Sequence, residues 1–229
     1  MALIEVGVSN EGLYVTADKF GTLELPLEPE IATPAEITVW GDVCEGQIYP
    51  EVVSEWFSDV LETDCQLVYM PDDSRRRVNP RFDDGGDIVS FADGYPLMLI
   101  GEASLAELNS RLDVQVPMNR FRPNLTVSGT EAFAEDDWKR IRIGSAVFRS
   151  TKPCARCVMT TVEQARGEFD GKEPLKTLAS YRMAKNVMPE RIEAFGLNDT
   201  AVLFGQNLIA ETPGAAVNVG DQIEVIESY

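Results

Sequence analysis

Histidine is absent from this chain of 229 residues. That absence removes the usual general base of enzymes, the Ser-His and Cys-His nucleophile pairs, and metal sites built on imidazole. Long apolar runs are also absent, since the stretch at residues 95–100 is too short to cross a bilayer. The first residues lack the basic start and apolar core of a signal peptide, so we expect a cytoplasmic protein.

Positive charge is scarce, with 20 Lys and Arg against 38 Asp and Glu and a formal net charge of -18. Such a surface repels nucleic-acid phosphates and anionic membranes, which argues against both as general partners. Two basic clusters interrupt it, at residues 75–77 and 120–122. An anionic ligand would be attracted electrostatically to these clusters. The alternatives for the second cluster are solvated surface or a structural salt-bridge hub.

Many short apolar segments separated by glycine and proline are typical of a β-rich fold. They predict strands at residues 3–8, 13–17, 23–27, 37–40, 65–70, 125–127 and 141–148, and several more within 201–226. Helical spacing predicts helices at 51–62, at 104–112 with Ser104 as cap and Glu107 in the capping-box position, and at 173–184, entered through Pro174. The polar residues 71–87 predict a long surface loop, suited to a mobile lid. The expected fold class is therefore mainly β with a few helices (α+β), with a β-barrel-like core.

The segment from Lys152 to Cys157 contains the strongest candidates for reactive or metal-binding residues. Its two cysteines fit half of a zinc site, although no second pair or histidine completes four ligands. They also fit a thioredoxin-like redox pair, although no βαβ context surrounds them. A single cysteine that binds a soft metal and two buried structural thiols are the other interpretations. Lys152 and Arg156 favour a thiolate electrostatically, which suits redox or ligand duty.

Two further segments contain clustered polar residues. Residues 119–124, Asn-Arg-Phe-Arg-Pro-Asn, form a compact donor-rich patch, and arginine is well built for bidentate contacts to phosphate or a planar heterocycle. Residues 135–138, Glu-Asp-Asp-Trp, could bind a divalent cation or do acid–base work. We favour a helix entry or a solvated turn for the acidic run.

In order along the chain, these segments resemble one family over nearly the whole length. The segments that carry the resemblance are residues 91–96 (FADGYP), 102–105 (EASL), 120–124 (RFRPN), 134–138 (AEDDW), 152–157 (KPCARC), 173–178 (EPLKTL), 204–207 (FGQN) and 219–221 (VGD). The chain is identified as a member of the MOSC (molybdenum cofactor sulfurase C-terminal) family, in the branch of bacterial YcbX-type proteins and the mitochondrial amidoxime reducing component. The resemblance implies a MOSC-type β-barrel core at 81–229, preceded by an incomplete β-rich subdomain at 1–80.

The resemblance also implies a site for the molybdenum cofactor (Mo-molybdopterin). In this branch the second cysteine of the P-C-x-R-C motif ligates molybdenum, which assigns the metal to Cys157 and leaves Cys154 as a neighbour. The remaining cofactor-binding residues implied are Arg122 and Asn124 at the pterin, Arg156 beside the ligand, Phe121 in the same block, and the flanking loop Asp93, Gly94, Tyr95 and Pro96. Asp93 is also the candidate proton donor among the catalytic residues.

The function implied is the reduction of N-hydroxylated compounds such as amidoximes, hydroxylamines and N-hydroxylated bases. Electrons would come from a separate donor protein, a ferredoxin- or flavoprotein-type reductase, because no cluster of four further cysteines follows the motifs. At the level of the family, the resemblance also implies pyridoxal phosphate binding. The alternative is a cofactor-binding or carrier module without turnover.

One departure from the family pattern concerns the start of the chain. Relatives begin with a segment that carries a Y-P-V-K-S-like motif and a later G-L-x-x-D-R motif, both of which help to bind the cofactor phosphate. This sequence begins after them. We expect weaker cofactor binding than in longer relatives, by about 1.5–3 kcal/mol for each charged hydrogen bond to the phosphate that those motifs would have made.

Overall fold

The computed structural model describes all 229 residues, which form two compact units. The first unit contains Met1–Gly94 and Gln164–Gly167, and the second contains Tyr95–Glu163 and Glu168–Tyr229. None of the helices combines the length and the apolar character needed to cross a bilayer. The boundary at residues 80 and 81 inferred from the family resemblance stays a prediction.

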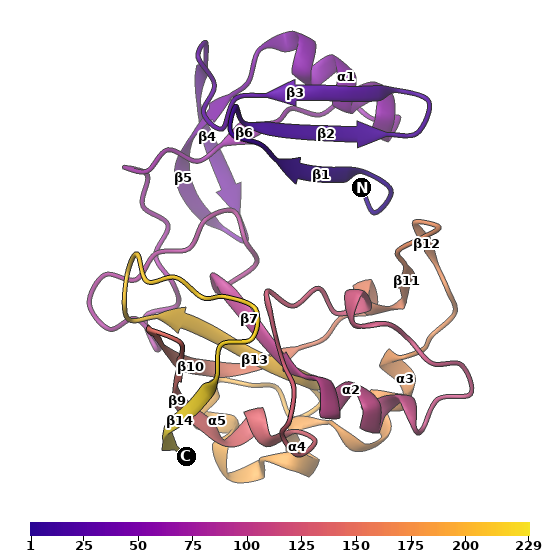
Figure 1. Cartoon of the computed structure of the whole chain (residues 1–229), viewed down its shortest axis with the longest axis vertical. Helices are drawn as coiled ribbons and strands as arrows, with labels where there is room; N and C mark the ends of the chain where they lie inside the picture. The colour runs from indigo at the N-terminus through magenta and orange to yellow at the C-terminus, as the bar shows by residue number, and fades with distance from the viewer. The chain divides into compact units, whose positions relative to one another are not determined.

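The first unit contains two small antiparallel sheets and one helix (Figure 1). Its elements are β1 (Glu5–Val8), β2 (Leu13–Ala17), β3 (Gly21–Leu25), β4 (Thr33–Val39), β5 (Asp42–Ile48), α1 (Glu51–Leu61) and β6 (Val68–Tyr69). Helix α1 buries Val53 against Val15 and Leu25 of the β1–β2–β3 sheet, and Tyr49 completes this core. The helix predicted at 51–62 is therefore confirmed, because one apolar stripe of it faces a sheet.

The first unit departs from the sequence prediction at two places. Strand β5 was not predicted, because polar residues interrupt its apolar ones and its inward positions are the small residues Cys44 and Gly46. Residues 71–87 are not simply a surface loop, since Ser74, Arg76 and Val78 are buried. The polar, turn-rich pattern of this segment gave no indication that an arginine within it is buried.

The second unit is built on a six-stranded sheet of order β14-β9-β10-β13-β7-β8. Its strands are β7 (Leu97–Gly101), β8 (Leu125–Val127), β9 (Trp138–Ile143), β10 (Ala146–Ala155), β13 (Leu203–Ala210) and β14 (Ile223–Ser228). All neighbours are antiparallel except β7 and β8, which are parallel and connected through helix α2 (Glu102–Asn109). Because β14 and β8 remain edge strands, the sheet is a half-barrel.

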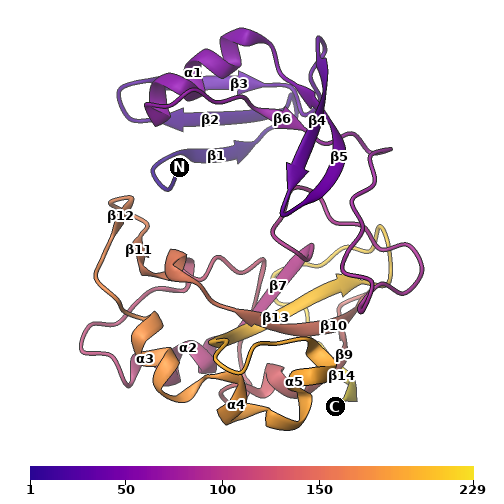
Figure 2. The ribbon, with the colours of Figure 1, turned by 180° about the vertical axis from the view of Figure 1, so that it is seen from behind.

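Short helices cover one face of this sheet (Figures 1 and 2). They are α2, α3 (Leu175–Tyr181), α4 (Ala184–Val187) and α5 (Ile192–Phe195). The unit also contains the 3₁₀ turns η1 (Met118–Arg120), η2 (Ala134–Asp137), η3 (Val158–Thr161) and η4 (Pro189–Arg191). A two-stranded ribbon, β11 (Val162–Glu163) and β12 (Glu168–Phe169), follows η3. The segment predicted as one helix at 173–184 ends at Tyr181 and resumes as α4.

Alternation along β7 divides the core of the second unit between the two faces of the sheet. Met98 and Ile100 belong to a buried cluster that also holds Phe121 and Phe204. Leu99, between them, belongs to a second cluster. Burial of each such side chain contributes about 1.5–3 kcal/mol, so both faces hold the strand that leads into α2.

The fold class predicted from the sequence is confirmed, since strands dominate and the helices are few and short. The predicted cap of the second helix was wrong. Helix α2 begins at Glu102, and Ser104 is a fully buried residue inside it. Glu107 pairs with Arg111 and Ser110 and forms no capping box.

Candidate functional site

The P-C-x-R-C segment lies where strand β10 ends beside β13. The register between the two strands shifts after Ser150 and again after Pro153, so the ladder is irregular directly before the motif. Gly205 of β13 has φ 86°, and a Cβ there would meet Leu99 O at 2.9 Å and Ile100 Cγ1 at 2.7 Å. Bulges of this kind re-aim side chains at functional sites. Here the irregular ladder ends the strand just before Cys157.

The two cysteines of the motif have different surroundings. Cys157 is the exposed thiol among four free cysteines, and it stands at the N-terminus of η3. Its carbonyl accepts hydrogen bonds from the Thr160 amide at 3.2 Å and the Thr160 hydroxyl at 3.0 Å. Thr160 is buried, so the backbone is fixed while the thiol faces solvent. Cys154 is half-buried and packs on the cluster of Phe121 and Phe204.

Arg156 joins the P-C-x-R-C segment to the R-F-R-P-N segment. Its Nη2 donates to Phe121 O at 2.7 Å, and its amide donates to Val202 O at 2.7 Å. Nη1 lies 3.1 Å from Cys154 Sγ and 2.8 Å from Met98 Sδ. The guanidinium therefore ties the two motifs together and contacts the sulfur of Cys154.

The R-F-R-P-N segment turns sharply at Arg122, which has φ 55°. A left-handed, non-glycine residue directly before a proline is a costly conformation, of the kind that is concentrated at functional sites. Arg122 is exposed and has no ion pair or hydrogen-bond partner in the structure. In an acidic protein, an unpaired arginine held in a strained turn is free to bind an anion.

Asn124 and Phe121 have structural roles on either side of that arginine. Asn124 Oδ1 accepts the Met98 amide at 2.9 Å, and the backbone amide of Asn124 donates to Met98 O at 2.9 Å. These bonds align the start of β8 with β7 and leave the side-chain nitrogen Nδ2 of Asn124 available. The Phe121 ring is buried against Phe204 with centroids 4.4 Å apart. Any contact of Phe121 with a ligand must therefore use its backbone.

Tyr95 approaches strand β10 close to the cysteine motif. Its ring lies 5.8 Å from Lys152 Nζ. Burial raises the pKa of Tyr95 to about 12, and a hydrogen bond with Thr151 partly opposes the rise. Tyr95 therefore stays a neutral hydrogen-bond donor at all physiological pH values. Pro96 follows it, half-buried, at the start of β7.

Asp93 and Gly94 belong to the first unit, which ends at Gly94. The carbonyl of Asp93 accepts a hydrogen bond from Arg76 Nη2 at 2.9 Å. The assignments of both residues stay predictions. The second unit brings together the other residues of the predicted site, which are Cys157, Arg156, Phe121, Arg122 and Asn124, with Tyr95 and Pro96 leading into β7.

Arg120 shows that the second basic cluster is partly a salt-bridge hub. It is buried, and its Nη2 lies 2.7 Å from Glu163 Oε2 and 3.3 Å from Asp170 Oδ2. One carboxylate lies in β11 and the other directly follows β12. Two other nitrogens, Nε and Nη1, are buried without a hydrogen-bond partner. Arg120 is therefore a structural cation, and Arg122 is the accessible cation of this cluster.

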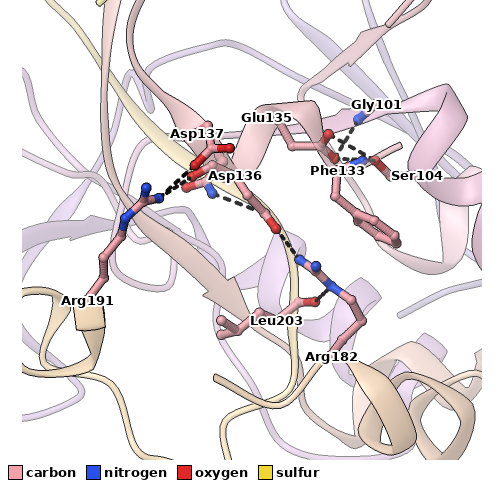
Figure 3. A network of polar contacts seen from close by, with 10 residues as sticks. Gly101, Ser104, Phe133, Glu135, Asp136, Asp137, Arg182, Arg191 and Leu203 are labelled. Carbon is pink, nitrogen blue, oxygen red and sulfur yellow. Dashed lines mark hydrogen bonds and ion pairs between the residues drawn. The ribbon is translucent and has the colours of Figure 1, made fainter. Parts of the chain in front are cut away.

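The three acids of the run at 135–138 belong to a network of polar contacts, which Figure 3 shows. Glu135 is fully buried, and its carboxylate accepts the Gly101 amide at 3.1 Å and the Ser104 hydroxyl at 2.7 Å. The Ser104 oxygen in turn accepts the Phe133 amide at 2.7 Å. Burial raises the pKa of Glu135. The prediction of a helix entry or a solvated turn is confirmed in its first form, since the three acids lie in the 3₁₀ helix η2. Glu135 itself is not solvated, because its carboxylate satisfies donors at the start of α2.

The rest of the network pairs arginines with the next two aspartates. Arg182 Nη2 lies 2.5 Å from Asp136 Oδ2, and Arg191 Nη1 lies 2.9 Å from Asp137 Oδ1 (Figure 3). The η2 network, defined here as Glu135, Asp136, Ser104 and Arg182, is thus saturated by protein partners. Its carboxylates are occupied structurally, which leaves none of them for a metal ion.

No group of three or more Cys, Asp or Glu side chains could hold a metal ion by protein ligands alone. A metal bound at Cys157 would therefore have to bring most of its other ligands with it. A soft metal chelated by an anionic organic cofactor meets that condition, with the thiolate as protein ligand and Arg122 as counter-charge. The donor set of the second unit fits such a group.

Comparison with known proteins identifies relatives along nearly the whole chain. The model of the MOSC domain matches residues 86–224. The human protein "Mitochondrial amidoxime-reducing component 1" is 32% identical over 231 residues, covering 99% of this chain and 66% of that protein. The zebrafish (Danio rerio) protein of the same name is 38% identical over 189 residues, covering 79% of this chain and 58% of that protein.

A second paralogue is also similar. The cattle (Bos taurus) protein "Mitochondrial amidoxime reducing component 2" is 34% identical over 189 residues, covering 80% of this chain and 56% of that protein. The chain spans about two thirds of the length of the human relative. Because the domain match covers more than half of the chain and contains Arg122 and Cys157, this chain belongs to the MOSC domain family.

Proposed function

We propose that this chain is a molybdenum-dependent oxidoreductase that reduces N-hydroxylated compounds, with the Cys157 thiolate as metal ligand. The observation that carries the proposal is the pairing of one exposed thiol on a fixed backbone with an unpaired, strained arginine. Arg156 links their two segments through Phe121 O. Relatives named for amidoxime reduction point to the same chemistry.

The residues of the second unit have distinct roles in this proposal. Cys157 anchors the metal, and Arg122 neutralises the anionic part of the cofactor. The Asn124 side-chain nitrogen offers a hydrogen bond to its ring system, and Tyr95, whose hydroxyl bonds Thr151, remains a proposed neighbour of the cofactor. When bound, the molybdenum cofactor supplies the two-electron chemistry of oxygen removal. No histidine is needed, since the protein only has to position the cofactor and the substrate.

The reaction is balanced by electrons and protons from outside the substrate. Reduction of an amidoxime to an amidine breaks one N–O bond, consumes two electrons and two protons, and releases one water. The electrons would come from a separate donor protein of ferredoxin or flavoprotein type. Asp93, on the flanking loop, is the proposed source of a proton.

A dithiol mechanism is disfavoured by the contrast between the two cysteines. Cys154 packs against the core and contacts the Arg156 guanidinium, while Cys157 is exposed. Two thiols that exchange a disulfide with a substrate both need access to an attacking partner. A cofactor carrier without turnover is a second alternative. It would use the same binding residues as a reductase, so only a measurement of substrate reduction distinguishes the two.

The test is reduction of benzamidoxime by the protein expressed in a host that makes the cofactor, with a reduced viologen dye as electron donor. The proposal predicts benzamidine formation that is lost in Cys157→Ser and retained in Cys154→Ser. Cofactor-loaded protein that forms no benzamidine, nor reduces any hydroxylamine, would establish the carrier instead. Equal loss of activity in both variants would favour the dithiol mechanism.

A further inference from the structure

The arginine triplet at residues 75–77 is not a uniform basic patch. Arg76 is only 4% exposed, whereas Arg75 and Arg77 face solvent. Arg77 pairs with Asp83 at 3.0 Å, and Arg75 donates to the carbonyl of Asp72 at 2.6 Å. The middle residue thus differs from both neighbours, although all three have the same side chain.

The buried guanidinium is committed to one stretch of backbone. Arg76 Nη1 donates to Ser90 O at 2.9 Å and to Ala92 O at 2.6 Å, and Nη2 donates to Asp93 O at 2.9 Å. The fourth bond, from Nε, goes to Asp42 Oδ2 at 3.1 Å. Three carbonyls within four residues therefore converge on one side chain.

These bonds hold a segment that lies outside the regular secondary structure. Residues 90–96 contain neither helix nor strand. Regular backbone bonds flank them, from the Val89 amide to Arg76 O at 2.9 Å on one side and in the β7 ladder that begins at Leu97 on the other. An irregular segment without a ladder depends on side chains to satisfy and fix its carbonyls.

We propose that Arg76 is a positioning residue that fixes the Ser90–Asp93 backbone and so fixes the chain that leads through Gly94 into Tyr95, a proposed neighbour of the cofactor. This inference rests on the proposed function, because the loop has a ligand only if the chain binds the molybdenum cofactor. Arg76 is not proposed as a ligand contact, since it is buried and four of its five N–H groups bond Asp42 and three carbonyls. It acts through the backbone of Asp93.

The geometry requires a guanidinium rather than any cation. A planar fork with five N–H groups reaches several acceptors in fixed directions, and all three nitrogens of Arg76 are used. A lysine ammonium is a single point donor on a flexible stem and cannot span Asp42 and three carbonyls together. Arg76→Lys therefore keeps the charge and removes the clamp.

The experiment compares Arg76→Lys with Arg77→Lys, the adjacent surface arginine, as matched control. Both proteins are expressed in a host that makes the cofactor, and three quantities are measured: amide hydrogen exchange of residues 88–96, the rate of molybdenum release, and the thermal midpoint. We expect Arg76→Lys to exchange faster at 88–96 and to release molybdenum about tenfold faster or more, as for other supporting residues of metal sites. Arg77→Lys should match wild type in all three quantities.

Several outcomes would overturn the inference. Faster exchange with molybdenum release at the wild-type rate would show a purely structural clamp, and unchanged exchange would show no clamp at all. Asp42→Asn, which removes only the charge of the Nε partner, should give an intermediate exchange rate and serves if Arg76→Lys unfolds. A wild-type protein that holds no molybdenum would refute the proposed function itself. In that case the role of Arg76 toward the cofactor falls too, whatever the exchange data show.

Discussion

The η2 network and the region around Cys157 are both rich in polar side chains, yet they differ in how those side chains are used. In the network, Glu135 and Asp136 are surrounded by donors of the same chain. Around Cys157, the thiol is exposed and Arg122 has no partner. A polar group with all its bonds made holds the fold, whereas one left free on a fixed backbone is available to a ligand.

The same contrast exists between the arginines of the two basic clusters. Arg76 and Arg120 are buried and bound to carbonyls or carboxylates, while Arg122 is exposed in a strained turn. In the sequence these residues form equivalent basic patches. Burial separates the structural arginines from the accessible one.

The largest expected effect comes from breaking the network at Glu135. Glu135→Ala leaves the Gly101 amide and the Ser104 hydroxyl without their acceptor and opens a cavity. We expect a loss of about 3–4 kcal/mol in the free energy of unfolding. Urea denaturation measures it. Glu135→Gln, which keeps an acceptor oxygen and the volume, is the control and should lose much less. Equal losses in the two variants would mean that neither the volume nor a single acceptor oxygen is sufficient, and that the second carboxylate oxygen accounts for the effect.

A smaller and more informative contrast lies between Arg120 and Arg122. Arg120→Met removes the cation shared by Glu163 and Asp170, and it also removes two buried nitrogens that lack partners. The net loss, measured by urea denaturation, should be about 1–2 kcal/mol of folding stability. Arg122→Met should change stability by less than about 0.5 kcal/mol, because the side chain is exposed.

Cofactor retention should reverse that order. Arg122→Met should speed molybdenum release by about tenfold or more, because it removes a charge-assisted hydrogen bond to the cofactor. Arg120→Met should change the release rate less once its folded fraction is taken into account. If Arg122→Met keeps the wild-type release rate, the unpaired arginine has no ligand and the contrast fails.

The smallest effect is a pH dependence of stability that originates in the network. Burial raises the pKa of Glu135 above its ordinary value of 4.5, so the folded protein binds this proton more tightly than the unfolded chain. The stabilising contribution is fully present below that value and is lost as the pH rises through the raised pKa. Wild type should therefore gain stability relative to Glu135→Gln as the pH is lowered toward 4.5. A constant difference across that window would mean that the pKa of Glu135 is not perturbed.

Much of the fold could be predicted from the sequence because local pattern and tertiary packing agree in it. Helix α1 and strand β2 follow amphipathic and alternating patterns that match the sheet core. Strand β5 was missed because its inward residues are small, and its side chains therefore produce a weak hydrophobic signal. The end of the predicted helix at Tyr181 depends on the buried Arg182, which turns to Asp136 and Leu203 O.

The type of site could be predicted from its motifs and from the family resemblance. The residues that support it could not be predicted. Cys157 and Arg122 come from motifs, and the structure places them on segments joined by Arg156. The supporting roles of Glu135 and Arg76 depend on burial, and no local pattern distinguishes a buried carboxylate or arginine from a solvated one. The Ser-x-x-Glu spacing at Ser104 misled for the same reason, since Ser104 is a buried partner of Glu135.

The most direct test of the metal assignment is the molybdenum content of wild type, Cys157→Ser and Cys154→Ser, purified from a host that makes the cofactor and measured by elemental mass spectrometry. If Cys157 is the ligand, metal should be near-stoichiometric in wild type and in Cys154→Ser, and almost absent from Cys157→Ser. Molybdenum that survives in Cys157→Ser, or that is absent from wild type, would contradict the assignment of the exposed thiol as the metal ligand.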